Sequence, residues 1–406
     1  MLRALLSLTT LAALIGCATT RDAGIGDRIA LVEPYETITA ADAPKLKWPL
    51  ENLAMVDPAD PLAEDFNTQT LSLFGREDLI AATSGSYKPT RCAAFATAGD
   101  PLDEIVRRAR VTSVVIVNES HERSEHRGFS AQIAARLRPL GYDTLAIETL
   151  SNPQPDTEPR FLPAYVTRPD QPYFEDGDGY YLVEAGFGRF GRQAKALGYH
   201  FVPYEMNFDD GLPQDAPVAR RIAVREEAQS SALARFIAGH PGVKLLVHVG
   251  YSHAREIPTA NGDVWMAARL KAQTGIDPLT ISQTTCQGGS AAVHLAAAPA
   301  ADDAGAFDLI VDHPDAHFVR GRPEWRVRAG DRPVTIPRKL RPTTGWRVIE
   351  ARPVGEPSTS IPMDRVAIRA GEDIALMLPP GRYRLRAIDV PPPTRTSRSR
   401  PSGSST

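Results

Sequence analysis

Short apolar runs alternate with longer amphipathic stretches through the middle of the chain. The apolar runs predict strands at about 112–118, 143–148, 199–205, 243–250, 278–284 and 307–312. The stretches between them predict helices at about 124–138, 181–196, 217–239 and 262–274. Strands that alternate with helices are typical of βαβ units. The sequence therefore predicts an α/β fold, with a mainly parallel sheet covered by helices on both faces.

The pattern changes on both sides of this core, which we place at residues 101–318. Short alternating strands with turns at "GE" and "PPG" predict a small β-rich C-terminal appendage at 319–390. Residues 18–100 combine loop-like stretches with one candidate helix, and we treat them as an N-terminal extension. The end of the chain, 391–406, is rich in Pro, Ser and Arg and is expected to be disordered.

The first 17 residues have the composition of an export signal. Arg3 precedes a mostly apolar stretch that is too short to span a bilayer. Leu14-Ile15-Gly16-Cys17 resembles the bacterial lipobox, which implies cleavage before Cys17 and attachment of lipid to its sulfur. The alternative is an ordinary signal peptide that is cut nearby. Ala18 follows the cysteine, which in some Gram-negative lipoproteins favours the outer membrane, so we expect a lipid-anchored protein facing the periplasm.

Export also changes what the cysteines imply. Of the three cysteines in the 406-residue chain, lipid would consume Cys17. Cys92 and Cys286 are then a candidate disulfide in an oxidising compartment, the alternative being two buried free thiols. The formal net charge is −3 and no basic stripe is present, which argues against a nucleic-acid partner.

Carboxylates and imidazoles follow the predicted strands at the point where each strand ends. Four successive strands deliver such side chains: Glu119 and His121, Glu148, Glu205, and His248 and His253. In an open α/β sheet, ligands bind outside the carboxyl ends of the strands. We therefore expect Glu119, His121, Glu148 and His253 to converge in one crevice.

The weaker candidates each have a plain structural alternative. Glu205 could be an ordinary loop acid, and His248, inside its strand, a hydrogen-bonded core histidine. Glu122, Glu125 and His126 lie in a first helical turn, where acids suit the helix dipole. His126 stays open between the two interpretations.

Four segments occur in the order of a known motif set: "NESHERSEH", "LGYDTLAIE", "REEAQ" and "HVGYSH". Over about 111–285 the chain resembles erythromycin-esterase-like proteins and their relatives, the ChaN-like haem-binding lipoproteins and the TraB/Tiki proteins. The resemblance implies that the site residues are Glu119, His121, Glu148, Arg225 and His253. Asn118 stands where these families usually have glycine, and its side chain should narrow the approach of a ligand to the backbone.

These residues suit hydrolysis by either of two routes. Without a metal, Glu119 or His121 activates water and Arg225 stabilises the oxyanion. We expect burial and Glu148 to raise the pKa of Glu119, with a neighbouring imidazolium or Arg225 acting in the opposite direction. With a divalent metal, His121, His253 and Glu148 are the candidate ligands. We prefer the metal-free route because an HExxH motif is absent, and the absence of GxSxG argues against a serine esterase.

Two further hypotheses remain open. The ChaN-like resemblance implies a carrier of haem or iron, in which a histidine is the axial ligand and the aromatic loop at 173–181 covers the porphyrin. The other hypothesis is a cell-envelope protein that keeps the fold without catalysis. The sequence does not identify a substrate.

Overall fold

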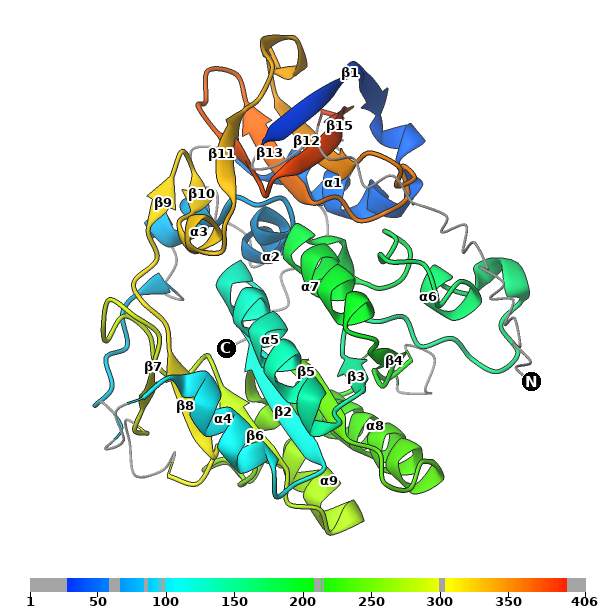
Figure 1. The fold of residues 1–406 in the computed structure, drawn as a ribbon. Coiled ribbons are helices and arrows are strands. Elements are labelled where there is room, and N and C mark those ends of the chain that lie inside the picture. Colours follow the sequence, from blue (N-terminus) through cyan, green and yellow to red (C-terminus); the bar gives the residue numbers. More distant parts are fainter. Residues whose placement is uncertain are drawn as a thin grey trace, which may run out of the picture.

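The structure, a computed structural model, describes residues 28–57, 66–83, 87–93, 95, 99–207, 213, 215–298 and 304–392. The predicted signal segment with Cys17, and the tail beyond residue 392, lie outside these residues. Figure 1 shows a β-rich unit at the top and a larger sheet with its helices below.

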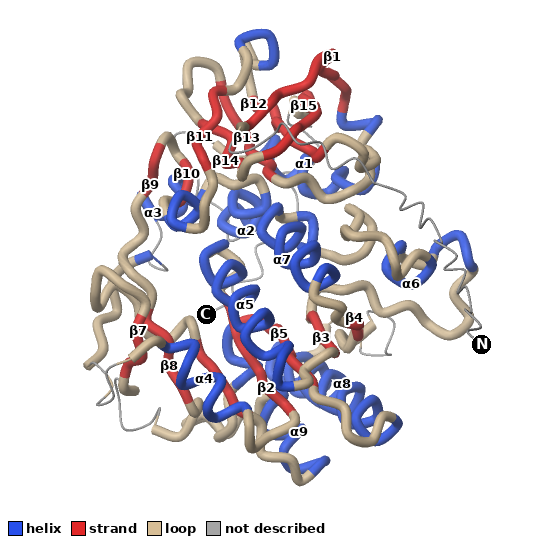
Figure 2. The backbone as a smooth tube through the Cα atoms, in the orientation of Figure 1, coloured by secondary structure: helices blue, strands red, loops and turns tan. Residues whose placement is uncertain are grey.

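The larger sheet has seven strands in the order β4-β3-β5-β2-β6-β8-β7. Their bounds are Val114–Glu119 (β2), Thr144–Ile147 (β3), His200–Val202 (β4), Leu245–Gly250 (β5), Leu279–Ser282 (β6), His294–Ala296 (β7) and Leu309–Asp312 (β8). All their pairings are parallel except that of β7 with β8. The prediction of an α/β protein with a mainly parallel sheet is confirmed, and Figure 2 traces these strands in red.

Helices pack on this sheet through alternate side chains of each strand. The helices are α4 (Pro101–Ala109), α5 (Ser124–Leu137), α7 (Ala185–Ala196), α8 (Val218–Gly239) and α9 (Met266–Thr274). Val115 and Val117 of β2 share a buried cluster with α4, α5 and α7, whereas Val114 and Ile116 share another with α8 and α9. Successive strand residues point to opposite faces, so a strand buried on both sides is apolar throughout.

The two ends of the described chain meet in a second sheet, with the order β1-β15-β12-β13. Its strands are Ile29–Thr39 (β1), Trp346–Pro353 (β12), Asp364–Arg369 (β13) and Gly381–Asp389 (β15), and β1 runs parallel to β15. A core under this sheet includes side chains of α1 (Lys47–Met55) and α2 (Phe66–Leu73). The N-terminal extension and the C-terminal β-rich region, separate in the sequence, therefore share one packed unit.

Smaller elements complete this unit and the long loop before α7. They are α3 (Glu77–Thr83), α6 (Ala164–Thr167), β9 (Phe318–Val319), β10 (Arg322–Pro323), α10 (Trp325–Arg328), β11 (Arg332–Thr335) and β14 (Ala375–Leu378). A buried ion pair joins the β-rich unit to the loop, since Arg365 of β13 lies 2.9 Å from Asp176. Arg365 also lies 2.6 Å from Glu350 of β12.

The predicted disulfide is present. Cys92 and Cys286 are bonded, with their Cα atoms 5.9 Å apart, within the range that a disulfide requires. The bond ties the segment before α4 to the loop after β6. Within the ranges that the structure describes, no helix has the length and apolar character needed to cross a membrane.

Candidate functional site

The turn between β2 and α5 places the first two site residues, and the N-terminal helices hold this turn. Glu77 of α3 accepts hydrogen bonds from the Ser124 hydroxyl at 2.5 Å and the Ser124 backbone N–H at 3.3 Å, which caps the start of α5. Ser72 of α2 donates to the backbone carbonyl of His121 at 2.8 Å. The position of His121 therefore depends on residues that are distant in sequence.

Glu119 is fully buried and pairs with both an imidazole and a guanidinium. Its Oε1 lies 3.0 Å from His121 Nδ1. Arg127 of α5 contacts both carboxylate oxygens, with Nε 2.8 Å from Oε2 and Nη2 2.9 Å from Oε1. Burial alone would raise the pKa of Glu119, but Arg127, with His248 and His121, lowers it to about 2. The expected rise in this pKa is wrong, because the charge of Arg127 outweighs the effect of burial. Glu119 is an anion at neutral pH.

This pairing predicts a stability change in acid. The unfolded chain protonates Glu119 near the ordinary carboxyl pKa of 4.5, whereas the folded protein does so only near pH 2. The stability that Glu119 contributes is therefore complete above about pH 4.5 and is lost as the pH falls toward 2. Urea unfolding across this range should show a steep decline that is smaller in Glu119→Gln. An equally steep decline in that variant would assign the effect to other carboxylates.

His121 lies in a space that only glycine at position 250 allows. A Cβ on Gly250 would lie 2.6 Å from Cε1 and 2.9 Å from Nε2 of His121, and 3.2 Å from Oε2 of Glu148. The imidazole also contacts the rings of Tyr181 and Tyr251, with centroids at 4.4 and 4.9 Å. Glu119 engages Nδ1, whereas Nε2 lies against Gly250, and the side chain is 18% exposed.

The second carboxylate, Glu148, follows β3 and is held by α8. It accepts the Gly250 backbone N–H at 2.5 Å and forms an ion pair with Arg225. Arg225 also binds Glu205, with Nε 3.0 Å from Oε1, and its Nη1 lies 3.2 Å from His253 Nε2. Burial opposes ionisation of Glu148, but His253, Arg225 and His121 together lower its pKa. The site thus holds two carboxylates as anions, each through a different arginine.

His253 lies in the 3-10 helix η7 (Tyr251–Ala254) after β5 and has its own carboxylate partner. Its Nδ1 is 2.7 Å from Oε1 of Glu226, whose Oε2 accepts the Met266 backbone N–H at 2.8 Å. Burial would lower the pKa of His253, but Glu148 and Glu226 raise it above the ordinary value. His253 is therefore a histidine that retains a proton more readily than usual.

The contacts bring the five main candidates together at the carboxyl edge of the sheet: Glu119, His121, Glu148, Arg225 and His253. Glu205 belongs to the same network through Arg225. His248 lies behind it, with Nε2 3.5 Å from Glu119 Oε2, and burial lowers its pKa to about 4. Of the two interpretations given from the sequence, a buried core histidine fits His248 better than a site residue does.

His126 does not reach this network. Its Nδ1 accepts the backbone N–H of Ser120 at 2.9 Å, and its ring faces that of His313 at 5.0 Å. Burial lowers its pKa well below the usual value. His126 therefore supports the turn that carries His121, as a neutral, structural residue.

Asn118 has a different role from the one expected. It is fully buried, and its Nδ2 donates to the Tyr251 carbonyl at 2.6 Å and to Thr284 Oγ1 at 3.0 Å. Its Oδ1 accepts the Gln283 backbone N–H at 2.7 Å. These bonds tie β2 to the turns after β5 and β6, so the side chain does not narrow the approach of a ligand.

Sequence reasoning missed the residues that hold the candidates in place. Arg127, Glu184 and Glu226 are buried and paired with site residues or with each other. Glu226 stands beside Arg225 in the quoted "REEAQ" motif and could have been noticed there. Arg127 carried no comparable signal, because only the packing of α5 on β2 brings it to Glu119.

Two of the three predicted metal ligands, Glu148 and His253, pair with other side chains. Glu148 is bound to Arg225, and His253 lies against Glu226 and Arg225. Within the described residues, no group of three or more His, Cys, Asp or Glu side chains has an arrangement that could hold a metal ion. The donor set of His121, His253 and Glu148 therefore does not fit a divalent metal as it stands.

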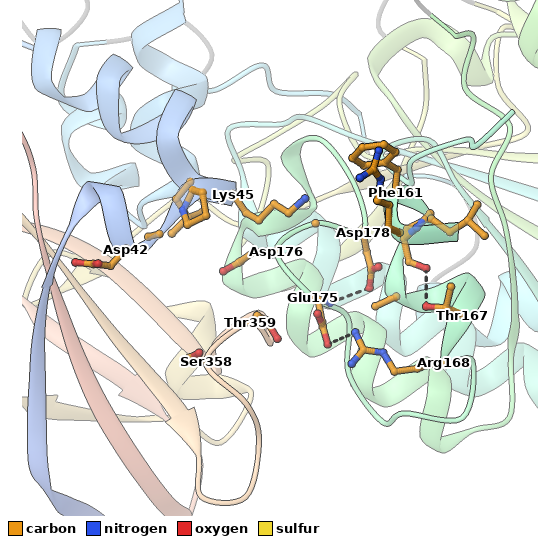
Figure 3. Close-up of a pocket in the computed structure, with 18 of the residues that line it drawn as sticks. Asp42, Lys45, Phe161, Thr167, Arg168, Glu175, Asp176, Asp178, Ser358 and Thr359 are labelled. Carbon is orange, nitrogen blue, oxygen red and sulfur yellow. Dashed lines mark hydrogen bonds and ion pairs between the residues drawn. The ribbon is translucent and has the colours of Figure 1, made fainter. Parts of the chain in front are cut away.

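A separate cavity of about 380 Å³ lies at the junction of the two units (Figure 3). Its lining includes Lys45, Phe161, Asp178 and Thr359, none of which belongs to the Glu/His network. Asp178 accepts the backbone N–H groups of Tyr165 and Glu175 and so organises the long loop. The cavity is distinct from the candidate site.

Comparisons with known proteins give only remote structural likenesses. No family model and no curated protein matches the chain. The type III effector HopBA1 is 14% identical with a TM-score of 0.36, over 57% of this chain and 100% of HopBA1. ChaN of Campylobacter jejuni, solved with cofacially bound haem, is 10% identical with a TM-score of 0.36, over 53% and 92%. RRSP, a MARTX toxin effector domain from Vibrio vulnificus, is 11% identical with a TM-score of 0.33, over 60% and 45%. At these low values, no argument rests on the likeness.

Proposed function

We propose that the protein is a hydrolase in which His121 activates a water molecule. The observation that supports this most directly is the Glu119–His121 pair, in which Arg127 keeps Glu119 ionised. A carboxylate at Nδ1 holds the proton on that nitrogen, which leaves the lone pair of Nε2 available as a base. Glu119 itself, with a pKa of about 2, is too weak a base near neutrality.

The remaining network suits the other parts of the reaction. Arg225 Nη1 carries two hydrogens, so it can contact His253 and still donate to an oxyanion. The contacts of His253 with Glu226 and Arg225 hold that guanidinium in position. The water oxygen bonds to the substrate carbon and gives its proton to His121. The bond to the leaving group then breaks as that group accepts this proton from the His121 imidazolium.

The test is a screen of ester and amide probes with the purified protein in the presence of EDTA. We expect turnover that EDTA does not reduce, because the carboxylate and imidazole donors are engaged by arginine and glutamate. In water labelled with ¹⁸O, single-turnover product should carry the label in its new carboxylate. Label found in a protein carboxylate, with unlabelled product, would identify an acyl-enzyme. Loss of activity with EDTA would indicate a metal.

The sequence-based hypothesis of a haem carrier has less support at this site. Both nitrogens of His253 contact side chains, Glu226 and Arg225, so a haem iron would have to use Nε2 of His121. Absorption spectra of the protein titrated with haem test this hypothesis. A Soret shift that is lost in His121→Asn would support the haem-carrier hypothesis in place of the hydrolase proposal.

The lipid anchor at Cys17 is also a proposal and rests on the sequence Leu14–Cys17 alone. We expect the mature protein in the membrane fraction, with an N-terminal mass that includes a diacylglyceryl group. Recovery of Cys17→Ser in the same fraction with the same mass would contradict it.

A further inference from the structure

Tyr251 has a backbone conformation that tyrosine rarely adopts. Its φ is 37°, and within the described ranges Arg320 is the only other residue besides glycine with a positive φ. A side chain with a Cβ is strained in this region, so the surrounding structure must hold it there. Asn118 does so, because its Nδ2 donates to the Tyr251 carbonyl at 2.6 Å. Such strain is found where a side chain has to be presented in a particular place.

The strained turn presents an aromatic ring beside His121. The ring of Tyr251 meets the His121 imidazole edge-on, with centroids 4.9 Å apart, yet the residue is 41% exposed. On the other side of His121 lies Tyr181, and the neighbouring Tyr180 is 48% exposed. The proposed base is therefore bordered by aromatic side chains, part of whose surface remains open to solvent.

The charge of the network limits what can approach these rings. The carboxylates outnumber the cations that bind them, even when His253 is protonated: Glu119, Glu148, Glu184, Glu205 and Glu226 against Arg127, Arg225 and His253. The partly exposed Arg225 is already shared between Glu148 and Glu205. An anionic ligand would face uncompensated carboxylates, whereas a neutral or cationic one would not.

We infer that the site takes a ring-bearing ester or amide without negative charge, whose ring packs on Tyr251 beside the bond that water attacks. This inference rests on the proposed function. Tyrosine binds flat apolar rings through its large amphipathic surface and attracts cations at its face. The strained backbone at Tyr251 is then the cost of positioning this contact surface.

The test measures binding without requiring turnover, so that it can fail independently of the hydrolase proposal. The probes are phenyltrimethylammonium and benzoate, titrated calorimetrically into the full protein. We expect the cation to bind at least about 10-fold more tightly than benzoate, and Tyr251→Ala to weaken its binding about 10-fold. Tyr251→Phe, which keeps the ring, should bind nearly as the parent. Equal affinities for the two probes, or unchanged binding in Tyr251→Ala, would refute the inference.

Phe161→Ala is the matched control. Phe161 is an exposed aromatic residue in the separate cavity of Figure 3, 65% exposed and outside the Glu/His network. This variant should bind the cation as the parent does. If Phe161→Ala weakens binding of the cation and Tyr251→Ala does not, the ring of the probe lies in that cavity and the inference is wrong.

A comparison of Tyr251→Gly with Tyr251→Ala separates backbone strain from the function of the ring. Both variants lose the ring, but glycine adopts a positive φ without strain. The glycine variant should therefore unfold at a higher temperature than the alanine variant, while both bind phenyltrimethylammonium about equally weakly. If the glycine variant binds as well as the parent, the ring has no role in recognition.

Discussion

Replacing His121 by Asn should lower kcat by about 10²–10⁴-fold, the usual contribution of a general base. The Asn amide can still donate a hydrogen bond toward Glu119, but it has no basic nitrogen with which to accept a proton from water. His121 is 18% exposed and contacts the rings of Tyr181 and Tyr251, so the substitution also removes some packing. The measurement is steady-state kinetics on a probe from the ester and amide screen, with circular dichroism to verify the fold.

The matched control for this variant is His200→Asn. His200 is exposed and begins β4, at the opposite end of the parallel sheet from the site. Its kcat and KM should equal those of the parent. Full activity in His121→Asn would show that another group activates water. A large loss in both variants would instead indicate general damage to the protein.

Replacing Glu119 by Gln should lower the free energy of unfolding by about 3–5 kcal/mol, in addition to its effect on activity. Arg127 is fully buried and uses two of its nitrogens on Glu119, so the variant leaves a buried guanidinium without its main counter-charge. Glu184, 3.1 Å from Arg127 Nη1, compensates only in part.

Urea unfolding at pH 7 measures this loss, and Glu158→Gln is the control. Glu158 pairs with Arg160 at 2.9 Å, but both side chains are mostly exposed, and exposed pairs contribute little. The control should unfold at nearly the parental urea concentration. If Glu119→Gln does so as well, Arg127 is stabilised by other groups, and the assignment of the buried pair is wrong.

Much of the α/β core was predictable from the sequence because its signals are local. The apolar runs that became β2, β3, β5 and β6 were found within two residues of their bounds, since a strand buried on both faces must be apolar throughout. Parallel order sends the ends of such strands to one edge, so Glu119 and Glu148 could be placed together without knowledge of the packing. The pairing of Cys92 with Cys286 followed from the expectation that lipid consumes Cys17, which leaves a single pair of cysteines.

The charge state of the site was decided only by tertiary structure. Glu119 was expected to be a poised base because burial and a second carboxylate were visible in the sequence pattern. The position of Arg127 against it depends on how α5 packs on β2. Likewise, the union of β1 with β15 joins residues more than 340 positions apart, and no local pattern specifies such a pairing. Sequence alone determined which side chains end the strands; long-range packing determined their partners, and therefore which of them can accept a proton.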